Sequence, residues 1–217
     1  MRKQDKSENI SANKSSEMQQ AANFFFGSIR NLNAITRYAN RLKSSKETVA
    51  AHVYYVSIYS MTLAKLIDKE IKVDYSKLYS LAMLHDIEEC ISGDIVRTLK
   101  IKMSEAFKQF SELSASTILD DLPEDIKKEY LDNWKTDDGS IESKIVKISD
   151  ELSGIAYCIE QISLGNTYFN NILNGYLVNL ETYTKGTPFS YLYPIIVGSV
   201  LSKIHIFHAE KTSTADR

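Results

Sequence analysis

The chain has few glycines and prolines, the residues that short strands and tight turns need between them. Its 217 residues include only 8 glycines and 3 prolines, the residue types that most strongly interrupt regular structure. Such sparse interruption favours long helices over many short strands. The two cysteines, Cys90 and Cys158, lie far apart in apolar stretches. We predict that both are buried free thiols rather than a disulfide, as suits a reducing compartment.

Long hydrophobic runs and an excess of one charge are also missing. No run of about 18 apolar residues could span a bilayer, and the polar first twenty residues hold no hydrophobic stretch typical of a signal peptide. The 26 basic and 28 acidic residues give a formal net charge of −2. No strong overall field therefore indicates binding to nucleic acid or to an anionic membrane. We expect a cytoplasmic protein without a membrane contact or a stable nucleic-acid complex.

The apolar residues that are present recur with helical spacing. A hydrophobic content of 43% in 217 residues is enough for one sizeable core. The segment 53–60 could be a strand from its β-branched and aromatic content, but its neighbours and length favour a helix. We predict an all-α protein with a single globular helical domain at 21–208, between flexible polar tails at 1–20 and 209–217. Predicted helices cover 21–40, 47–70, 75–91, 102–120, 124–133, 140–164, 168–185 and 188–208, with stops at Gly93, Pro123, Gly139, Gly165 and Gly186.

Four polar residues stand inside apolar helical segments: His52, His85, Asp86 and Asp150. Burying an imidazole or carboxylate without a partner is costly, so each must be hydrogen-bonded, paired or metal-bound. Singly, each has a simpler explanation, because a lone histidine is often a satisfied core residue and Asp150 could cap a helix or pair with Lys147. Together they form a mixed nitrogen and oxygen set suited to Zn²⁺, Mn²⁺, Co²⁺ or Fe²⁺. An octahedral ion would keep positions open for water and a phosphate oxygen.

Acidic residues follow this set along the chain. Glu89 comes four residues after His85, so on one helix the two share a face, and Glu89 could orient or deprotonate a water on the metal. Glu88 lies one step round the helix, where it is solvated or paired. After Gly93 the residue Asp94 either caps the next element or contacts substrate. Trp134 stands in a polar stretch, which indicates a surface or subunit contact.

The order of the four candidate ligands resembles the signature of the HD-domain phosphohydrolase superfamily, and the flanking residues resemble the bacterial 5′-deoxynucleotidase family within it. Related HD-type enzymes remove triphosphate from deoxynucleoside triphosphates. The resemblance runs from about residue 24 to residue 175. The matching segments are 35–38, 47–52, 81–89, 92–95, 145–152 and 158–161, followed by Gly165, Asn166 and Phe169.

This resemblance implies a helical HD-domain bundle and a role for each matching residue. The implied metal ligands are His52, His85, Asp86 and Asp150. The implied water-positioning residue is Glu89. The implied substrate contacts are Arg37 for phosphate, Tyr38 and Asp94 for the sugar, and Lys100 and Lys147 near the phosphates.

The chain departs from the family pattern at three places. Tyr38 replaces a tryptophan that helps exclude a ribose 2′-hydroxyl, and Ala51 replaces a glutamate beside the first ligand. The loop at 93–98 lacks both family prolines and carries Arg97, which could suit a longer phosphate chain.

From the resemblance we expect a divalent-metal-dependent hydrolase, using Co²⁺, Mn²⁺ or Zn²⁺ with Mg²⁺ as an alternative, that assembles as a homo-oligomer. The expected reaction converts deoxynucleoside 5′-monophosphates into deoxynucleoside and phosphate. A deoxynucleoside triphosphate triphosphohydrolase is the alternative. A non-catalytic nucleotide sensor is the second alternative, although the complete ligand set and Glu89 argue against it.

Overall fold

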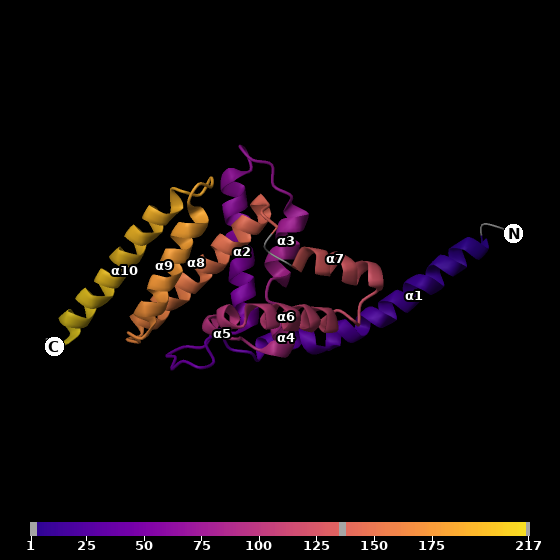
Figure 1. Ribbon diagram of the computed structural model, residues 1–217, viewed down its shortest axis with the longest axis horizontal. Coiled ribbons are helices and arrows are strands. Elements are labelled where there is room, and N and C mark those ends of the chain that lie inside the picture. Colours follow the sequence, from indigo (N-terminus) through magenta and orange to yellow (C-terminus); the bar gives the residue numbers. More distant parts are fainter. Residues whose placement is uncertain (1–3, 135–137, 216–217) are drawn as a thin grey trace. The chain divides into compact units, whose positions relative to one another are not determined.

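The computed structural model describes residues 4–134 and 138–215, with side chains described for 14–134 and 138–203. In these residues regular structure is entirely helical, apart from one isolated β-bridge between Thr36 and Thr48 (Figure 1). The all-α prediction is confirmed. None of the helices in the described residues is long and apolar enough to cross a membrane.

The elements are α1 (Gln4–Phe26), η1 (Ser28–Asn33), α2 (Val49–Ile67), α3 (Tyr75–Leu84), α4 (Glu89–Ser92), α5 (Arg97–Lys102), α6 (Ser104–Ile118), α7 (Glu124–Trp134), α8 (Ile141–Ser163), α9 (Phe169–Thr184) and α10 (Leu192–Ala215).

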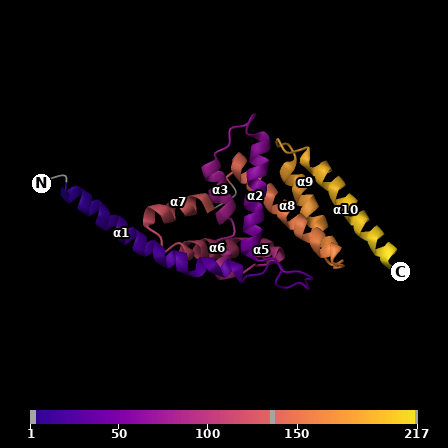
Figure 2. The ribbon, with the colours of Figure 1, turned by 180° about the vertical axis from the view of Figure 1, so that it is seen from behind.

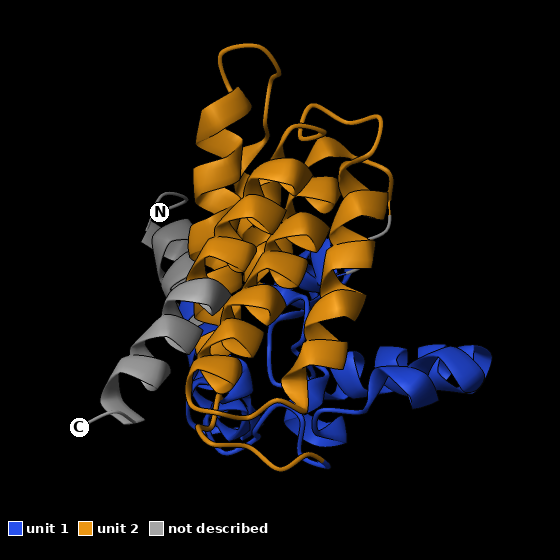
Figure 3. Cartoon of the chain, turned by 90° about the vertical axis from the view of Figure 1, so that its left-hand side faces the viewer, with its two compact units in different colours: residues 1–40, 48–50, 84–135 blue, residues 41–47, 51–83, 136–217 orange. Residues whose placement is uncertain are grey.

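The described residues fall into two compact units, coloured separately in Figure 3. Unit 1 takes its residues from 1–40, 48–50 and 84–135, and unit 2 from 41–47, 51–83 and 136–217. The expected domain at 21–208 therefore contains parts of both units. Its limits remain a prediction.

Unit 1 is built around the 3-10 helix η1 and helices α4 and α6. Helix α4 packs against both η1 and α6, and α1 packs against η1. The buried residues of α6 recur at spacings of three and four, which places them on one face. The side chain of Gln20 on α1 donates a hydrogen bond to the carbonyl of Leu122 at 3.0 Å, which anchors the last part of α1. Cys90 is a buried free thiol here, as predicted.

Unit 2 is a packed set of long helices in which α8, α9 and α10 lie side by side in both ribbon views (Figures 1 and 2). Helix α8 begins where the hydroxyl of Ser140 accepts a hydrogen bond from the Ser143 amide at 3.2 Å. It ends before the turn at Gly165, whose positive φ of 91° suits glycine. Cys158 is a buried free thiol in this helix, again as predicted.

Hydrogen bonds join the segment 41–47 to the second half of α8. They connect Ser44 and Ser45 with Tyr157 and Gln161, and we call these four residues the α8 latch. The Ser44 amide donates to Oε1 of the fully buried Gln161 at 2.8 Å. Gln161 Nε2 donates to the Ser45 hydroxyl at 2.7 Å, and the Tyr157 hydroxyl donates to the Ser45 carbonyl at 2.8 Å. The latch fixes the chain just before α2.

The first predicted helix, at 21–40, is wrong in its second half. Helix α1 ends at Phe26, a 3-10 helix follows, and Tyr38 lies in the left-handed region with φ of 56°. The reason is local, because Gly27 and the serine and asparagines after it favour caps and turns over helix interiors. Residues 4–20 and 209–215, which we expected to be tails, belong to α1 and α10, while their flexibility remains a prediction. Residues 1–3 and 216–217 lie outside the described part of the chain.

Candidate metal centre

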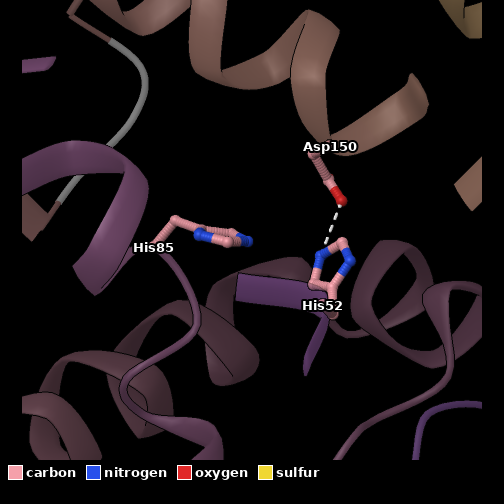
Figure 4. Close-up of side chains that lie close together, drawn as sticks. All are labelled: His52, His85 and Asp150. Atoms are coloured by element: carbon pink, nitrogen blue, oxygen red, sulfur yellow. Dashed lines mark ion pairs between the residues drawn. The ribbon is translucent and has the colours of Figure 1, made fainter. Parts of the chain in front are cut away.

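Helices α2 and α8 bring His52 and Asp150 together. The His52 ring is fully buried, and its Nε2 lies 3.0 Å from Oδ1 of Asp150 (Figure 4). Its Nδ1 lies 2.9 Å from the hydroxyl of Ser153, one turn further along α8. Asp150 lies in the middle of α8, so the alternative of a helix-capping role is wrong.

One of the two tautomers of His52 suits a metal-binding histidine. In the tautomer whose Nδ1–H donates to Ser153, the lone pair on Nε2 faces a carboxylate oxygen of Asp150. Two acceptor atoms at this separation need a proton or a cation between them. A hydrogen bond to the far ring nitrogen is also the usual way in which proteins orient a histidine ligand. The donor set therefore fits a divalent metal ion.

His85 follows directly after α3 and adds a further candidate ligand. It belongs to unit 1, whereas His52 and Asp150 belong to unit 2. Its Nε2 atom lies 3.3 Å from Oδ2 of its neighbour Asp86. Imidazoles and carboxylates are the mixed nitrogen and oxygen donors that first-row divalent metals accept.

The chain leaves the α-helix at His85, which corrects the predicted helix over 75–91. Helix α3 ends at Leu84, and residues 85–88 form a turn. Its backbone bonds join residues three apart, including the Glu89 amide to the Asp86 carbonyl at 3.1 Å. Residues three apart align in such a turn, so the inference that His85 and Glu89 share an α-helical face is wrong.

Three acids gather at this turn instead. One ligand atom each of Asp86, Glu88 and Glu89 lie within 4.8 Å of one another. Burial, and then the charge of Asp86, raise the pKa of Glu89 to about 9 and that of Glu88 to about 7. A buried cluster with three acids and one neighbouring lysine favours a further positive charge, as a metal ion supplies.

Lys100, predicted to lie near phosphates, contacts this cluster. Its Nζ lies 3.1 Å from Oε1 of Glu89 and 5.2 Å from the ring centroid of Phe107. Burial lowers the pKa of Lys100, but the charges of Glu89, Asp86 and Glu88 outweigh it and leave the pKa raised. Lys100 therefore stays charged and holds Glu89 in place.

The predicted sugar-contacting residues Tyr38 and Asp94 are bonded to each other. The Tyr38 amide donates a short hydrogen bond to Oδ2 of Asp94. Helix α5 is capped by Val96, so Asp94 does not cap it and that alternative is wrong. The guanidinium carbon of Arg37 lies 5.3 Å from the centroid of the Tyr38 ring. All three belong to unit 1.

Lys147, the last predicted substrate contact, lies on α8 in unit 2. It stands one turn before Asp150, so both residues lie on one side of the helix. Its Nζ lies 5.9 Å from the centroid of the Tyr183 ring on α9.

Sequence reasoning missed two residues that bond to the candidate site. Ser153 holds the His52 ring, and its spacing of three from Asp150 along α8 could have indicated it. Trp134 was expected at the surface but is buried, and its Nε1–H donates to Oε2 of Glu88 at 3.1 Å. Glu88 is therefore paired rather than solvated. The polar neighbours of Trp134 gave no sign of this contact.

Known proteins share both this fold and this sequence pattern. The chain is 26% identical over 153 residues to the 5′-deoxynucleotidase of Pectobacterium atrosepticum, which covers 67% of this chain and 76% of that protein. It is 27% identical over 151 residues to the 5′-deoxynucleotidase of Vibrio cholerae, covering 65% and 76%.

Among solved structures, an HD-domain phosphohydrolase from Listeria innocua matches with a TM-score of 0.74 and 23% identity, over 88% of this chain and 97% of that one. A predicted metal-dependent phosphohydrolase from Magnetospirillum magnetotacticum matches with a TM-score of 0.66 and 19% identity, over 87% and 94%. At these identities the two structures show a shared HD-domain fold.

A match to a protein-family model shows which family the chain belongs to. The model described as 5′-deoxynucleotidase YfbR-like matches residues 24–193, most of the chain. The expected resemblance to HD-domain 5′-deoxynucleotidases is confirmed, and so is the expectation of an enzyme. The chain belongs to the YfbR-like 5′-deoxynucleotidase family and is a hydrolase.

Proposed function

We propose that this protein is a divalent-metal-dependent phosphohydrolase that converts deoxynucleoside 5′-monophosphates into deoxynucleoside and phosphate. One observation carries the metal dependence. The buried His52 ring lies 2.9 Å from the Ser153 hydroxyl on one side and 3.0 Å from an Asp150 carboxylate oxygen on the other. The substrate class follows from the family and from relatives named as 5′-deoxynucleotidases.

The proposed ligands are His52, His85, Asp86 and Asp150. Co²⁺, Mn²⁺ and Zn²⁺ suit two imidazoles and two carboxylates, and Mg²⁺ is the alternative. A divalent cation bound there would polarise a phosphate oxygen and ease the ionisation of a water molecule.

Glu89 is the proposed proton acceptor. Its carboxyl group shares the turn with Asp86 and is held by Lys100 at 3.1 Å. The charge of a divalent cation bound at Asp86 would offset the burial and the repulsion from Asp86 that raise the pKa of Glu89, so that Glu89 is ionised and can hold a water molecule and take its proton. The oxygen of that water attacks the phosphorus atom in line with the 5′-oxygen, whose bond to phosphorus breaks. The proton taken by Glu89 passes to the departing 5′-oxygen, which gives phosphate and deoxynucleoside. Lys100 and Lys147 offset the negative charge that develops on the phosphoryl oxygens.

The remaining proposed contacts select the nucleotide. Arg37 binds the phosphate, and Asp94 accepts a hydrogen bond from a sugar hydroxyl. Tyr38 presses on the sugar. We also propose that the enzyme works in the cytoplasm as a homo-oligomer. The two buried free thiols suit a reducing compartment, and light scattering coupled to size-exclusion chromatography measures the subunit number.

A product-resolved screen tests the substrate class. The full chain is incubated with each deoxynucleoside and ribonucleoside mono- and triphosphate under Mn²⁺, Co²⁺, Zn²⁺ or Mg²⁺. Malachite green detects free phosphate, and ion-exchange chromatography detects intact triphosphate. We expect phosphate from deoxynucleoside monophosphates. Finding neither product with any nucleotide would refute a catalytic role and leave nucleotide binding without turnover, the sensor alternative.

A matched pair of variants tests the metal site. Asp86→Ala should abolish metal binding in calorimetry and lower turnover by more than about 100-fold, because even residues that only support ligands typically contribute 10–100-fold. Asp121→Ala removes an exposed carboxylate of the same unit and should behave as wild type. Full activity in Asp86→Ala would show that the ligand assignment is wrong.

The triphosphohydrolase alternative has one feature in its favour. Arg97 is exposed at the first position of α5, after a loop without proline, and could bind a longer phosphate chain. Release of intact triphosphate in the same screen would identify that reaction.

A further inference from the structure

Trp134 makes a buried hydrogen bond that the proposed reaction does not use. It is the only tryptophan of the chain and the last residue of α7. Its indole is 8% exposed, and Glu88, whose Oε2 accepts the indole proton at 3.1 Å, is 5% exposed. Burying a carboxylate in this way costs free energy that a structural contact between two apolar side chains would avoid. The pair therefore needs a reason beyond packing.

The position of Glu88 supplies that reason. It lies in the turn 85–88, two residues after Asp86 and one before Glu89. One carboxylate oxygen of each of these three acids lies within 4.8 Å of the others, so Glu88 could compete for a cation at Asp86. An indole donates one hydrogen bond and carries no charge, so it holds a carboxylate in a fixed direction without neutralising it.

The turn also needs side-chain anchors. It has no continuous α-helical ladder, since α3 ends at Leu84 and α4 begins at Glu89. Two acids at the turn bond to other helices, Glu88 to α7 through Trp134 and Glu89 to α5 through Lys100. All of these residues belong to unit 1.

We propose that Trp134 is a positioning residue of the metal centre. Its indole N–H keeps the Glu88 carboxylate away from the cation and so fixes the turn that presents His85 and Asp86. This inference rests on the proposed metal site at those two residues. Residues that orient ligands in this way typically contribute 10–100-fold to metal affinity.

Trp134→Phe removes the indole N–H and keeps an aromatic ring. Calorimetric titration of the metal-free full chain with Mn²⁺ should give a dissociation constant about tenfold or more above that of wild type. Tyr130→Phe, which removes a polar group from a half-buried ring on the same helix, is the matched control and should leave the constant unchanged.

A double-mutant cycle separates this role from simple packing. In Glu88→Ala no side chain remains either to accept the indole bond or to compete for the cation, so adding Trp134→Phe should change Mn²⁺ affinity by less than about threefold. The wild-type protein supplies a readout that needs no variant. Emission from its single tryptophan should change saturably with Mn²⁺, at the midpoint found by calorimetry.

The outcomes are distinct. An Mn²⁺ dissociation constant in Trp134→Phe within twofold of wild type, with only a lower melting temperature, would make Trp134 merely structural and overturn the inference. An equal loss of affinity in both Glu88 backgrounds, or tryptophan emission that ignores Mn²⁺, would also overturn it. If wild type itself binds no Mn²⁺, the proposed metal site fails and the inference fails with it.

Discussion

Gly154 lets α8 and α9 approach closely, and its replacement by alanine measures that contact. A Cβ atom built on Gly154 would lie 2.8 Å from Cδ1 of Tyr176 and closer still to two other carbons of that ring. Alanine is favoured over glycine inside a helix by about 1 kcal/mol, whereas overpacking a filled interior costs about 1–3 kcal/mol. We expect Gly154→Ala to lower the free energy of unfolding by roughly 1 kcal/mol, the difference between these two effects.

Gly175 on α9 is the matched control. No heavy atom lies within 4 Å of a Cβ built there, so Gly175→Ala should gain the helix preference alone and raise the free energy of unfolding by about 0.5–1 kcal/mol. Urea denaturation followed by far-ultraviolet circular dichroism measures both variants. In a chain of this size each kcal/mol corresponds to about 2–4 °C in melting temperature. Equal stabilisation by the two alanines would refute the reasoning, because the Tyr176 ring would then cost nothing to move.

Three further predictions follow from buried or bonded side chains. Burial raises the pKa of Cys90 to about 12, so the thiol stays protonated at pH 8 and Ellman's reagent should label it only after unfolding. Gln161→Leu removes the hydrogen bonds of the fully buried Gln161 to Ser44 and Ser45, which are exposed and half-buried and can bond to water instead, so it should lower the free energy of unfolding in urea by about 0.5–1.5 kcal/mol for each bond lost. The bond to Lys77 lowers the pKa of Asp138, so the pair stabilises the fold above the ordinary aspartate value of 3.8 and loses that contribution as the pH falls below it. The urea midpoint of Asp138→Asn should therefore lie slightly below that of wild type from pH 5 to 8, a gap that begins to narrow only as the pH falls below the ordinary value of 3.8.

Helix positions were predictable where the chain carries strong local signals. The helix expected at 124–133 is α7, which begins directly after Pro123, and the one expected at 140–164 is α8, which follows the turn at Gly139. The end of α3 was not predictable, because apolar residues continue at helical spacing through Leu84 and Ile87. Residues of the turn that follows bond to partners elsewhere in the chain, as Glu88 does to Trp134, and a hydrophobic period carries no information about such contacts.

The candidate site likewise has residues that the sequence indicated and contacts that it did not. His52 and Asp150 were recognisable as polar residues in apolar surroundings, and the structure brings them to 3.0 Å. The contacts that orient such groups were not recognisable. Trp134 has polar neighbours, so its burial against Glu88 follows only from how α7 packs. The ligand roles themselves remain proposals that the Asp86 variant tests.

The α8 latch also has a consequence for how the protein folds. Ser44 and Gln161 are separated by 117 residues in the sequence. Bringing them together closes a large loop, and the loss of chain entropy comes before any hydrogen bond can offset it. We therefore expect these contacts to form late, after α8 and its local partners are in place. Gln161→Leu should therefore leave the refolding rate nearly unchanged and speed unfolding, with almost all of its destabilisation appearing in the unfolding arm of the chevron plot. On this reasoning we expect the segment just before α2 to be among the last parts of unit 2 to fold and among the first to unfold.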